Sequence, residues 1–226
     1  MLRIAIVAGV TAVLSLSTAQ AQPVDETEFD LTPNPAFVKC LGPDPQAHVK
    51  VTRGKLNDRL QISFSGINPN LAFDLFTVQR SNLGANGQPD PNFKGSFGLA
   101  WYQTDLEANN RGSGRAEIRT ILLDQIFGFD ADPTPGSTAT PPPTRVPPTN
   151  TFHVGFWFND PNDAAACGFD VTKPTPFNGE HKAGPLAMIS LPVPPANLGP
   201  LCTSPTGVSE DDAAKDPTGL TFVCNP

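Results

Sequence analysis

Apolar side chains alternate with polar ones in segment 151–159, and this pattern constrains the fold more than any other feature of the sequence. Four apolar residues occupy every second position: Phe152, Val154, Phe156 and Phe158. Because successive side chains of a strand point to opposite faces, the spacing predicts a β-strand with one face buried in an antiparallel sheet. The other face carries the remaining five residues: Thr151, His153, Gly155, Trp157 and Asn159. The glycine leaves a notch where a ligand or another backbone can approach.

The same alternation recurs along the chain and predicts further strands. These lie at about 49–52, 60–65, 71–79, 96–102, 116–122 and 186–193. Segment 71–79 carries apolar groups on both faces, which indicates a central strand. The 19 glycines and 26 prolines among 226 residues favour many turns and few long helices. We therefore expect an all-β fold, a single antiparallel β-sandwich of Greek-key type with long Pro-rich loops.

The N-terminus has the parts of a secretory signal peptide. Arg3 precedes an apolar run at 4–16, and Ala19-Gln20-Ala21 forms a cleavage site. We expect residues 1–21 to be removed, which predicts a secreted or periplasmic protein. No later apolar run is long enough to cross a bilayer, so no membrane span is expected.

One domain is expected after the signal peptide. Residues 22–44, which are Pro-rich and begin with acidic residues, are predicted to form an N-terminal leader, and 45–226 the sandwich domain. Segment 129–150 has almost no core-forming residues, and its prolines favour an extended flap. A domain boundary there is the alternative, but the residues after it cannot easily form a core of their own. Residues 194–226 are predicted to be a loop-rich C-terminal tail.

The cysteine count predicts two disulfides, because it is even in a chain with an export signal. The cysteines are Cys40, Cys167, Cys202 and Cys224, and four cysteines allow three pairings. We favour Cys40–Cys167 together with Cys202–Cys224, because the second bond would hold an acidic tail. No C-x-x-C occurs, which argues against a zinc cluster.

The net charge of the chain argues against a nucleic-acid partner. The formal net charge is −7, and binding to a phosphate backbone requires clustered Lys and Arg. We expect no nucleic-acid partner.

A polar rim follows the strand at 151–159 and is a candidate metal site. Asp160 and Asp163 could bind a divalent metal, with His153, Glu180 and His181 as further ligands, since carboxylate and imidazole suit several such metals. The calcium-loop pattern fails at Ala164 and Ala165. The alternative is a capped turn beside a sheet edge, with a histidine bonded to backbone. No other cofactor is predicted.

A binding surface is the second candidate. Trp157, with His153 and with Trp101 or Tyr102, could hold the flat face of a carbohydrate or another small ligand. Glu180 and His181 complete the predicted binding set. The alternative is that the flap or a second sheet covers Trp157.

Catalysis is the third candidate. The sequence contains no G-x-S-x-G, no H-E-x-x-H and no Gly-rich phosphate loop. Glu180 paired with Asp160 or Asp163 would suit glycoside hydrolysis, but nothing in the sequence fixes their separation. We favour a secreted, non-catalytic binding or structural module with an unidentified carbohydrate or protein partner. The alternative is a metal-dependent or acid/base hydrolase acting at the polar rim.

A resemblance to a group of secreted bacterial proteins without assigned activity is carried by three stretches: FGLAWYQTDLEANNRGSG, FHVGFWFNDPNDAAACGF and TPFNGEHKAGPLAMIS. It spans about Leu56–Ser190, implies export and a bacterial origin, and supplies no catalytic residue. A secreted β-sandwich with histidines is also similar to the fold of copper/zinc superoxide dismutases. Those enzymes place more histidines around their metals than the three of this chain, so this resemblance concerns the fold and not the activity.

Overall fold

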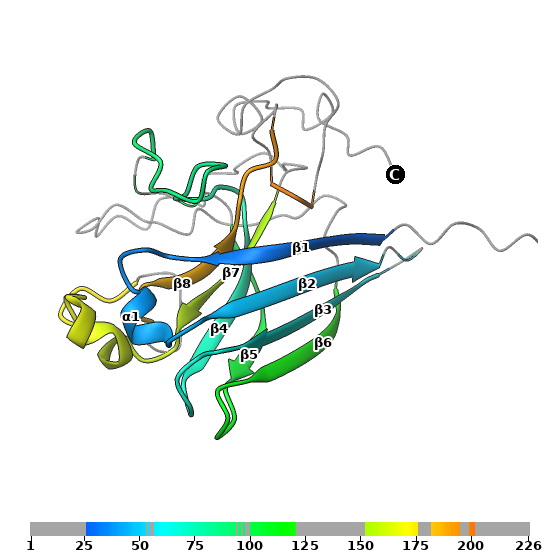
Figure 1. Cartoon of the computed structure of the whole chain (residues 1–226). Helices are drawn as coiled ribbons and strands as arrows, with labels where there is room; N and C mark the ends of the chain where they lie inside the picture. The colour runs from blue at the N-terminus through cyan, green and yellow to red at the C-terminus, as the bar shows by residue number, and fades with distance from the viewer. Residues whose placement is uncertain are drawn as a thin grey trace, which may run out of the picture.

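Strands dominate the computed structural model of the chain (Figure 1). It describes residues 26–52, 54, 57–93, 95, 97, 100–120, 152–175, 182–194 and 199–201. The elements are β1 (Glu26–Pro33), α1 (Val38–Leu41), β2 (Gln46–Thr52), β3 (Asp58–Ser65), β4 (Ala72–Val78), β5 (Ala100–Glu107), β6 (Gly114–Thr120), β7 (His153–Phe158), the 3-10 helix η1 (Pro161–Cys167) and β8 (Leu186–Ser190). The predicted signal peptide 1–21, the flap 129–150 and nearly all of the tail 194–226 lie outside the described residues.

All eight of these strands belong to one antiparallel sheet, in the order β5-β4-β7-β8-β1-β2-β3-β6. The two outermost strands, β5 and β6, follow each other in the chain and contact each other near the turn that joins them. In that turn, the Asn109 amide donates to the Ser113 carbonyl (2.9 Å). The sheet therefore curls until it is nearly a barrel. The all-β class is confirmed, whereas a two-sheet sandwich of Greek-key type is not.

A glycine ties the turn between β5 and β6 to the end of β3. The φ of Gly112 is 70°, a left-handed conformation that favours glycine. Its carbonyl accepts from the Ile67 amide (3.1 Å), and a Cβ on Gly112 would collide with the Ile67 carbonyl oxygen. Only glycine lets the two turns lie this close, and the contact holds the open side of the sheet together at this end.

The main core fills the inside of the curled sheet. The alternating face of β7 lies in it, as predicted from residues 152, 154, 156 and 158. Phe73 of β4 packs against Phe156 and Phe158, with ring centroids 4.8 and 5.4 Å apart. The spacing of apolar residues thus does fix which face of β7 is internal.

A second, smaller core covers the outer face of β4, β7 and β8. Its buried members are Phe76, Val78, Leu83, Trp157, Leu186 and Ile189. The segment after β4 supplies Leu83 and Phe97, which pack over Trp157. Strands β4 and β7 are therefore buried on both faces. Segment 71–79 was predicted to be central because it is apolar on both faces, but β4 is second in the strand order, beside the outermost strand β5.

Strand β1 departs from the predicted leader at 22–44. Glu26–Pro33 pairs with β2 on one side and with β8 on the other, near the middle of the sheet. Leu31 is buried in the main core and Phe29 packs against it, while Glu26, Glu28 and Asp30 are exposed. Only one face of this strand needs apolar residues, so an acidic outer face is compatible with a place inside the sheet.

A disulfide between Cys40 and Cys167 joins α1 to η1. It confirms the first of the two predicted pairs, while Cys202 and Cys224 lie outside the described residues. Disulfides form in oxidising compartments, so this bond is compatible with export.

Within the described ranges, no helix is long and apolar enough to cross a membrane.

Candidate functional site

His153 is buried in the sheet and is held by Ser190 of β8. Its Nδ1 lies 3.0 Å from the Ser190 carbonyl oxygen and 3.1 Å from the Ser190 Oγ. Because a carbonyl only accepts, Nδ1 carries the proton and donates it. The amide of Val154 also donates to Ser190 Oγ (3.1 Å). This geometry matches the alternative interpretation, a histidine bonded to backbone.

Trp157 is also buried, with 1% of its surface exposed. Its ring packs edge to face against Phe76 (5.6 Å between centroids) and Phe97 (5.2 Å). It is therefore not the exposed platform predicted for a flat ligand, although Trp101 and Tyr102 are exposed on β5. Any ligand that meets Trp157 must enter a hollow beside the second core.

The described part of the polar rim is a capped turn. Asp160 precedes η1, and its carboxylate accepts from the Asn162 amide (2.8 Å). Burial, followed by the negative charge of Asp160, raises the pKa of the Asp163 carboxyl. Glu180 and His181 lie outside the described residues. Among the residues that the structure describes, no group of three His, Cys, Asp or Glu is arranged to hold a metal.

A hollow of about 640 Å³ lies beside Trp157, which we call the Trp157 hollow. Its lining is mostly apolar. The aromatic residues of this lining are Phe37, Phe93, Phe97, Trp157 and Phe169. The polar ones are Asn34, Asn82, Lys173 and Thr175. The hollow brings together the segment between β1 and α1, the segment after β4, and the chain that follows η1.

Two asparagines of this hollow differ in their hydrogen bonding. Asn34 donates from Nδ2 to the Leu186 carbonyl (3.1 Å) and accepts at Oδ1 from the Ala36 amide (3.2 Å). The Oδ1 of Asn82 is buried, and no described residue hydrogen-bonds to it. Buried polar atoms are usually paired, so Asn82 is an acceptor that a donor from a ligand can satisfy.

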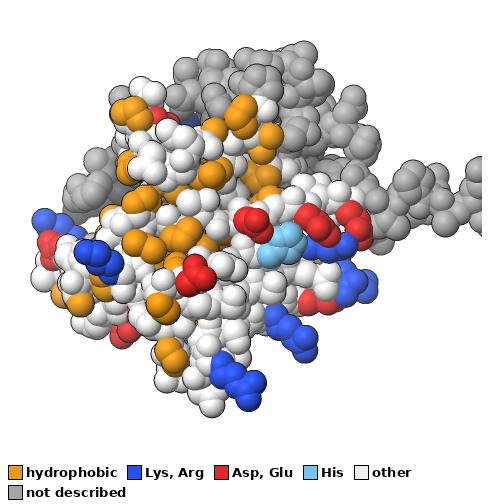
Figure 2. All heavy atoms as spheres, viewed as in Figure 1, with side chains coloured by type: hydrophobic (Ala, Val, Ile, Leu, Met, Phe, Trp, Pro, Cys, Tyr) orange, Lys and Arg blue, Asp and Glu red, His pale blue; other side chains and the backbone are white. Residues whose placement is uncertain are grey.

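A different chemistry covers the outer face of β1, β2, β3 and β6. The register places exposed or half-buried side chains in three rows across these four strands. The first row is Asp30, His48, Ser63 and Arg115. The second row is Glu28, Lys50, Gln61 and Glu117. The third row is Glu26, Thr52, Arg59 and Arg119. Figure 2 shows acidic, basic and histidine side chains gathered over β1, β2 and β3.

Ion pairs link the second and third rows. Lys50 Nζ lies 2.7 Å from a Glu26 oxygen and 3.0 Å from a Glu28 oxygen. Arg59 donates two hydrogen bonds to Glu117, at 2.7 and 2.6 Å. The hydrogen bond from Lys50 lowers the pKa of Glu26, and the one from Arg59 lowers the pKa of Glu117. The charges of these rows are therefore largely satisfied within the face.

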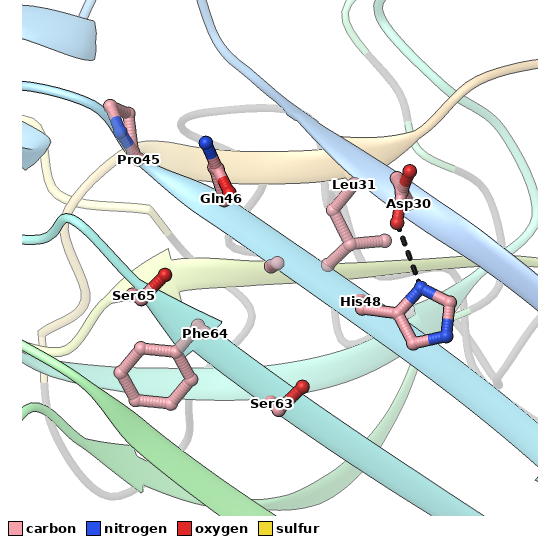
Figure 3. Close-up of a pocket in the computed structure, with 9 residues that line it drawn as sticks. Asp30, Leu31, Pro45, Gln46, His48, Ser63, Phe64 and Ser65 are labelled. Carbon is pink, nitrogen blue, oxygen red and sulfur yellow. Dashed lines mark hydrogen bonds and ion pairs between the residues drawn. The ribbon is translucent and has the colours of Figure 1, made fainter.

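The first row borders a groove, which we call the His48 groove (Figure 3). It consists of two hollows, of about 400 and 600 Å³, that are both lined by His48 and Ser63. Ser65 lines the first hollow and Arg115 the second. The short serine side chains leave this space between longer neighbours. His48 donates from Nδ1 to Asp30 Oδ1 (2.8 Å), which fixes the ring on the β1 side.

Asp30, His48 and Ser63 are the three residue types of a hydrolytic triad, but their geometry is not that of one. No hydrogen bond joins His48 to Ser63 in the described structure, and in Figure 3 the imidazole leans toward Asp30 and away from Ser63. Ser63 lies inside β3, which pairs with a strand on each side. The backbone amides there hydrogen-bond within the sheet and are not free to stabilise an oxyanion.

Sequence reasoning named Trp157, which lines one hollow as a buried residue, but it missed the His48 groove. Alternation places Lys50, Gln61 and Ser63 on the outer face of predicted strands. This polar face is the one feature of the sequence that could have indicated the groove. The groove depends on β1 and on the strand order, and neither was predicted.

No protein-family model matches the chain, and a search of curated proteins finds no match.

Proposed function

We propose that this protein is a secreted, non-catalytic binding module of the periplasm or cell exterior, which holds a small, mainly apolar ligand in the Trp157 hollow. The observation that carries the proposal is an aromatic-lined hollow beside a buried acceptor, Asn82 Oδ1, without a partner in the described chain. Small-molecule sites are concave, mostly apolar, and contain a few polar groups that orient the ligand.

The size and chemistry of the hollow define the ligand class. A volume of about 640 Å³ falls within the range of about 300–1,000 Å³ that is usual for small-molecule sites. Aromatic walls favour a ligand with flat or branched apolar surface. Asn82 Oδ1 favours one hydroxyl or amine donor on that ligand, because an acceptor left unpaired in a filled site weakens binding. Support for export comes from the Cys40–Cys167 bond.

A fluorescence titration tests the proposal. The chain has two tryptophans, so Trp101→Phe leaves Trp157 as the only reporter. We expect a neutral fluorescent naphthylamine to bind saturably and to receive energy from Trp157. Phe93→Ala should weaken binding about tenfold, equivalent to about 1.4 kcal/mol of lost apolar contact.

Phe29→Ala is the matched control, because it removes a half-buried phenylalanine of β1 that does not line the hollow. Its affinity should remain within about twofold of the parent, a difference below about 0.5 kcal/mol. The absence of saturable binding, or equal losses in the two variants, would rule out the Trp157 hollow as the site.

The hydrolase at the polar rim is the second candidate, and one observation favours it. The raised pKa of Asp163 is a property of acids that donate a proton in catalysis. Elemental analysis and thermal melts with and without EDTA test its metal-dependent form, since a bound metal stabilises the folded state by mass action. Stoichiometric metal and a lower melting temperature in chelator would support a metal-dependent hydrolase. A melting temperature that EDTA does not change, together with no metal in the elemental analysis, would rule it out.

A further inference from the structure

Arg115 differs from the other cations that line the His48 groove. Lys50, which also lines it, is held by Glu26 and Glu28, and neighbouring Arg59 is held by Glu117. Arg115 is exposed at the wall of the larger hollow and forms no ion pair with any described residue. Its guanidinium, which presents a planar set of donors to a carboxylate, is therefore available to a ligand.

The floor of the groove adds hydroxyl groups. Ser63 and Ser65 are exposed, and neither hydroxyl hydrogen-bonds to another part of the described chain. Each can donate one hydrogen bond and accept others. Asp30, on the opposite wall from Arg115, accepts from His48 through one oxygen, and 82% of its side chain is exposed.

This distribution of charge selects among anions. A phosphate or a polyanion would meet Asp30 and Glu28 on the β1 side of the groove, and like charges repel. A ligand with one carboxylate and several hydroxyls avoids that cost, because its carboxylate can lie at Arg115 while its hydroxyls donate to Asp30.

We propose that the His48 groove binds an acidic carbohydrate. Its carboxylate pairs with Arg115, its hydroxyls bond to Ser63 and Ser65, and hydroxyls farther along donate to Asp30. The four strands β1, β2, β3 and β6 span about 14 Å from first to last, at about 4.8 Å between neighbours, which is room for a short oligosaccharide. The site is separate from the Trp157 hollow, and its test does not depend on the ligand proposed there.

Calorimetric titration of residues 22–226 tests the proposal. The ligand is an acidic trimer of two glucoses and one terminal glucuronic acid, which carries a single carboxylate. We expect saturable binding, weakened about tenfold or more by Arg115→Ala, since a charge-assisted pair contributes about 1.5–3 kcal/mol. Arg119→Ala is the matched control, because it removes the same charge from the same face of β6, two rows away. That control should change the affinity by less than about twofold. Maltotriose, which lacks the carboxylate, should bind at least about tenfold more weakly than the acidic trimer.

Three results would overturn the proposal. Absence of saturable binding of the trimer would rule out the His48 groove as a site for acidic carbohydrate. Equal losses in the Arg115 and Arg119 variants would reduce the effect to long-range attraction. Binding of a glutamate tripeptide as tightly as the trimer would reassign the groove to acidic peptides.

Discussion

Ser190 holds two buried groups of the neighbouring strand at once. Its hydroxyl oxygen accepts from the Val154 amide, and its carbonyl accepts from His153 Nδ1. Both residues of β7 are fully buried, so water cannot replace a lost partner. A buried donor without a partner costs more than the hydrogen bond itself contributes.

Ser190→Ala should therefore lower the free energy of unfolding by about 1–3 kcal/mol. The physical reason is that the Val154 amide loses its acceptor while it remains buried. Urea unfolding followed by circular dichroism gives the value. Ser63→Ala is the control, because the exposed Ser63 has no partner in the described chain, and its change should stay within about 0.5 kcal/mol. Equal effects in the two variants would contradict the role assigned to Ser190.

At the scale of elements, ion pairs connect neighbouring strands on the outer face. The pKa of Glu117 is lowered, first by the hydrogen bonds from Arg59, and the pKa of Glu26 is lowered, first by the one from Lys50. A carboxyl with a lowered pKa in the folded state stabilises the fold above its unfolded pKa. That contribution disappears as pH falls through the folded-state pKa.

Arg59→Gln should move the pKa of Glu117 back toward its ordinary value of 4.5, because the bidentate partner is gone. A carbon-detected NMR titration of the Glu117 carboxyl measures this midpoint. Arg111→Gln, in the turn between β5 and β6, should leave it unchanged. The same midpoint in wild type and in the Arg59 variant would contradict the ion pair.

The alternation of apolar residues predicted the strands that bury a regular face, such as β2, β3 and β7. It placed β5 several residues too early, because Leu106 is the one buried residue of that strand. It failed at β1, where acidic residues occupy the outer positions and suggested a solvated leader. Residues far apart in sequence decide the rest. Only the pairing of β1 with β2 and β8 brings Asp30 opposite His48, and only the segment after β4 explains why Trp157 is buried. The periodicity of apolar residues within one segment cannot predict either of these contacts, because each joins segments that are far apart in the sequence.

At the scale of the whole molecule, β1 connects two halves of the sheet. It lies between β8, which continues to β7, β4 and β5, and β2, which continues to β3 and β6. Apart from the turn between β5 and β6, the hydrogen-bonded continuity of the sheet passes through this one strand. The outer face is apolar and covered over β4, β7 and β8, and charged and exposed or half-buried over β1, β2, β3 and β6.

Deletion of residues 22–33 should abolish cooperative unfolding, because the sheet would lose the strand that joins its halves. Thermal melts of residues 22–226 and of residues 34–226, followed by circular dichroism, measure this. A deleted chain that melts cooperatively near the temperature of the parent would restore the interpretation of this segment as a leader.

The central claim is that two binding regions with different chemistry lie over different halves of the outer face of one sheet. Amide NMR of ¹⁵N-labelled residues 22–226 tests it most directly. Titration with the neutral naphthylamine should shift the Trp157 indole signal and the amides of residues 82–93 and 169–175. Titration with the acidic trimer should shift the amides of Ser63, Ser65 and Arg115, and leave the first set unchanged. Shifts that overlap between the two titrations, or that spread over the whole sheet, would contradict the account.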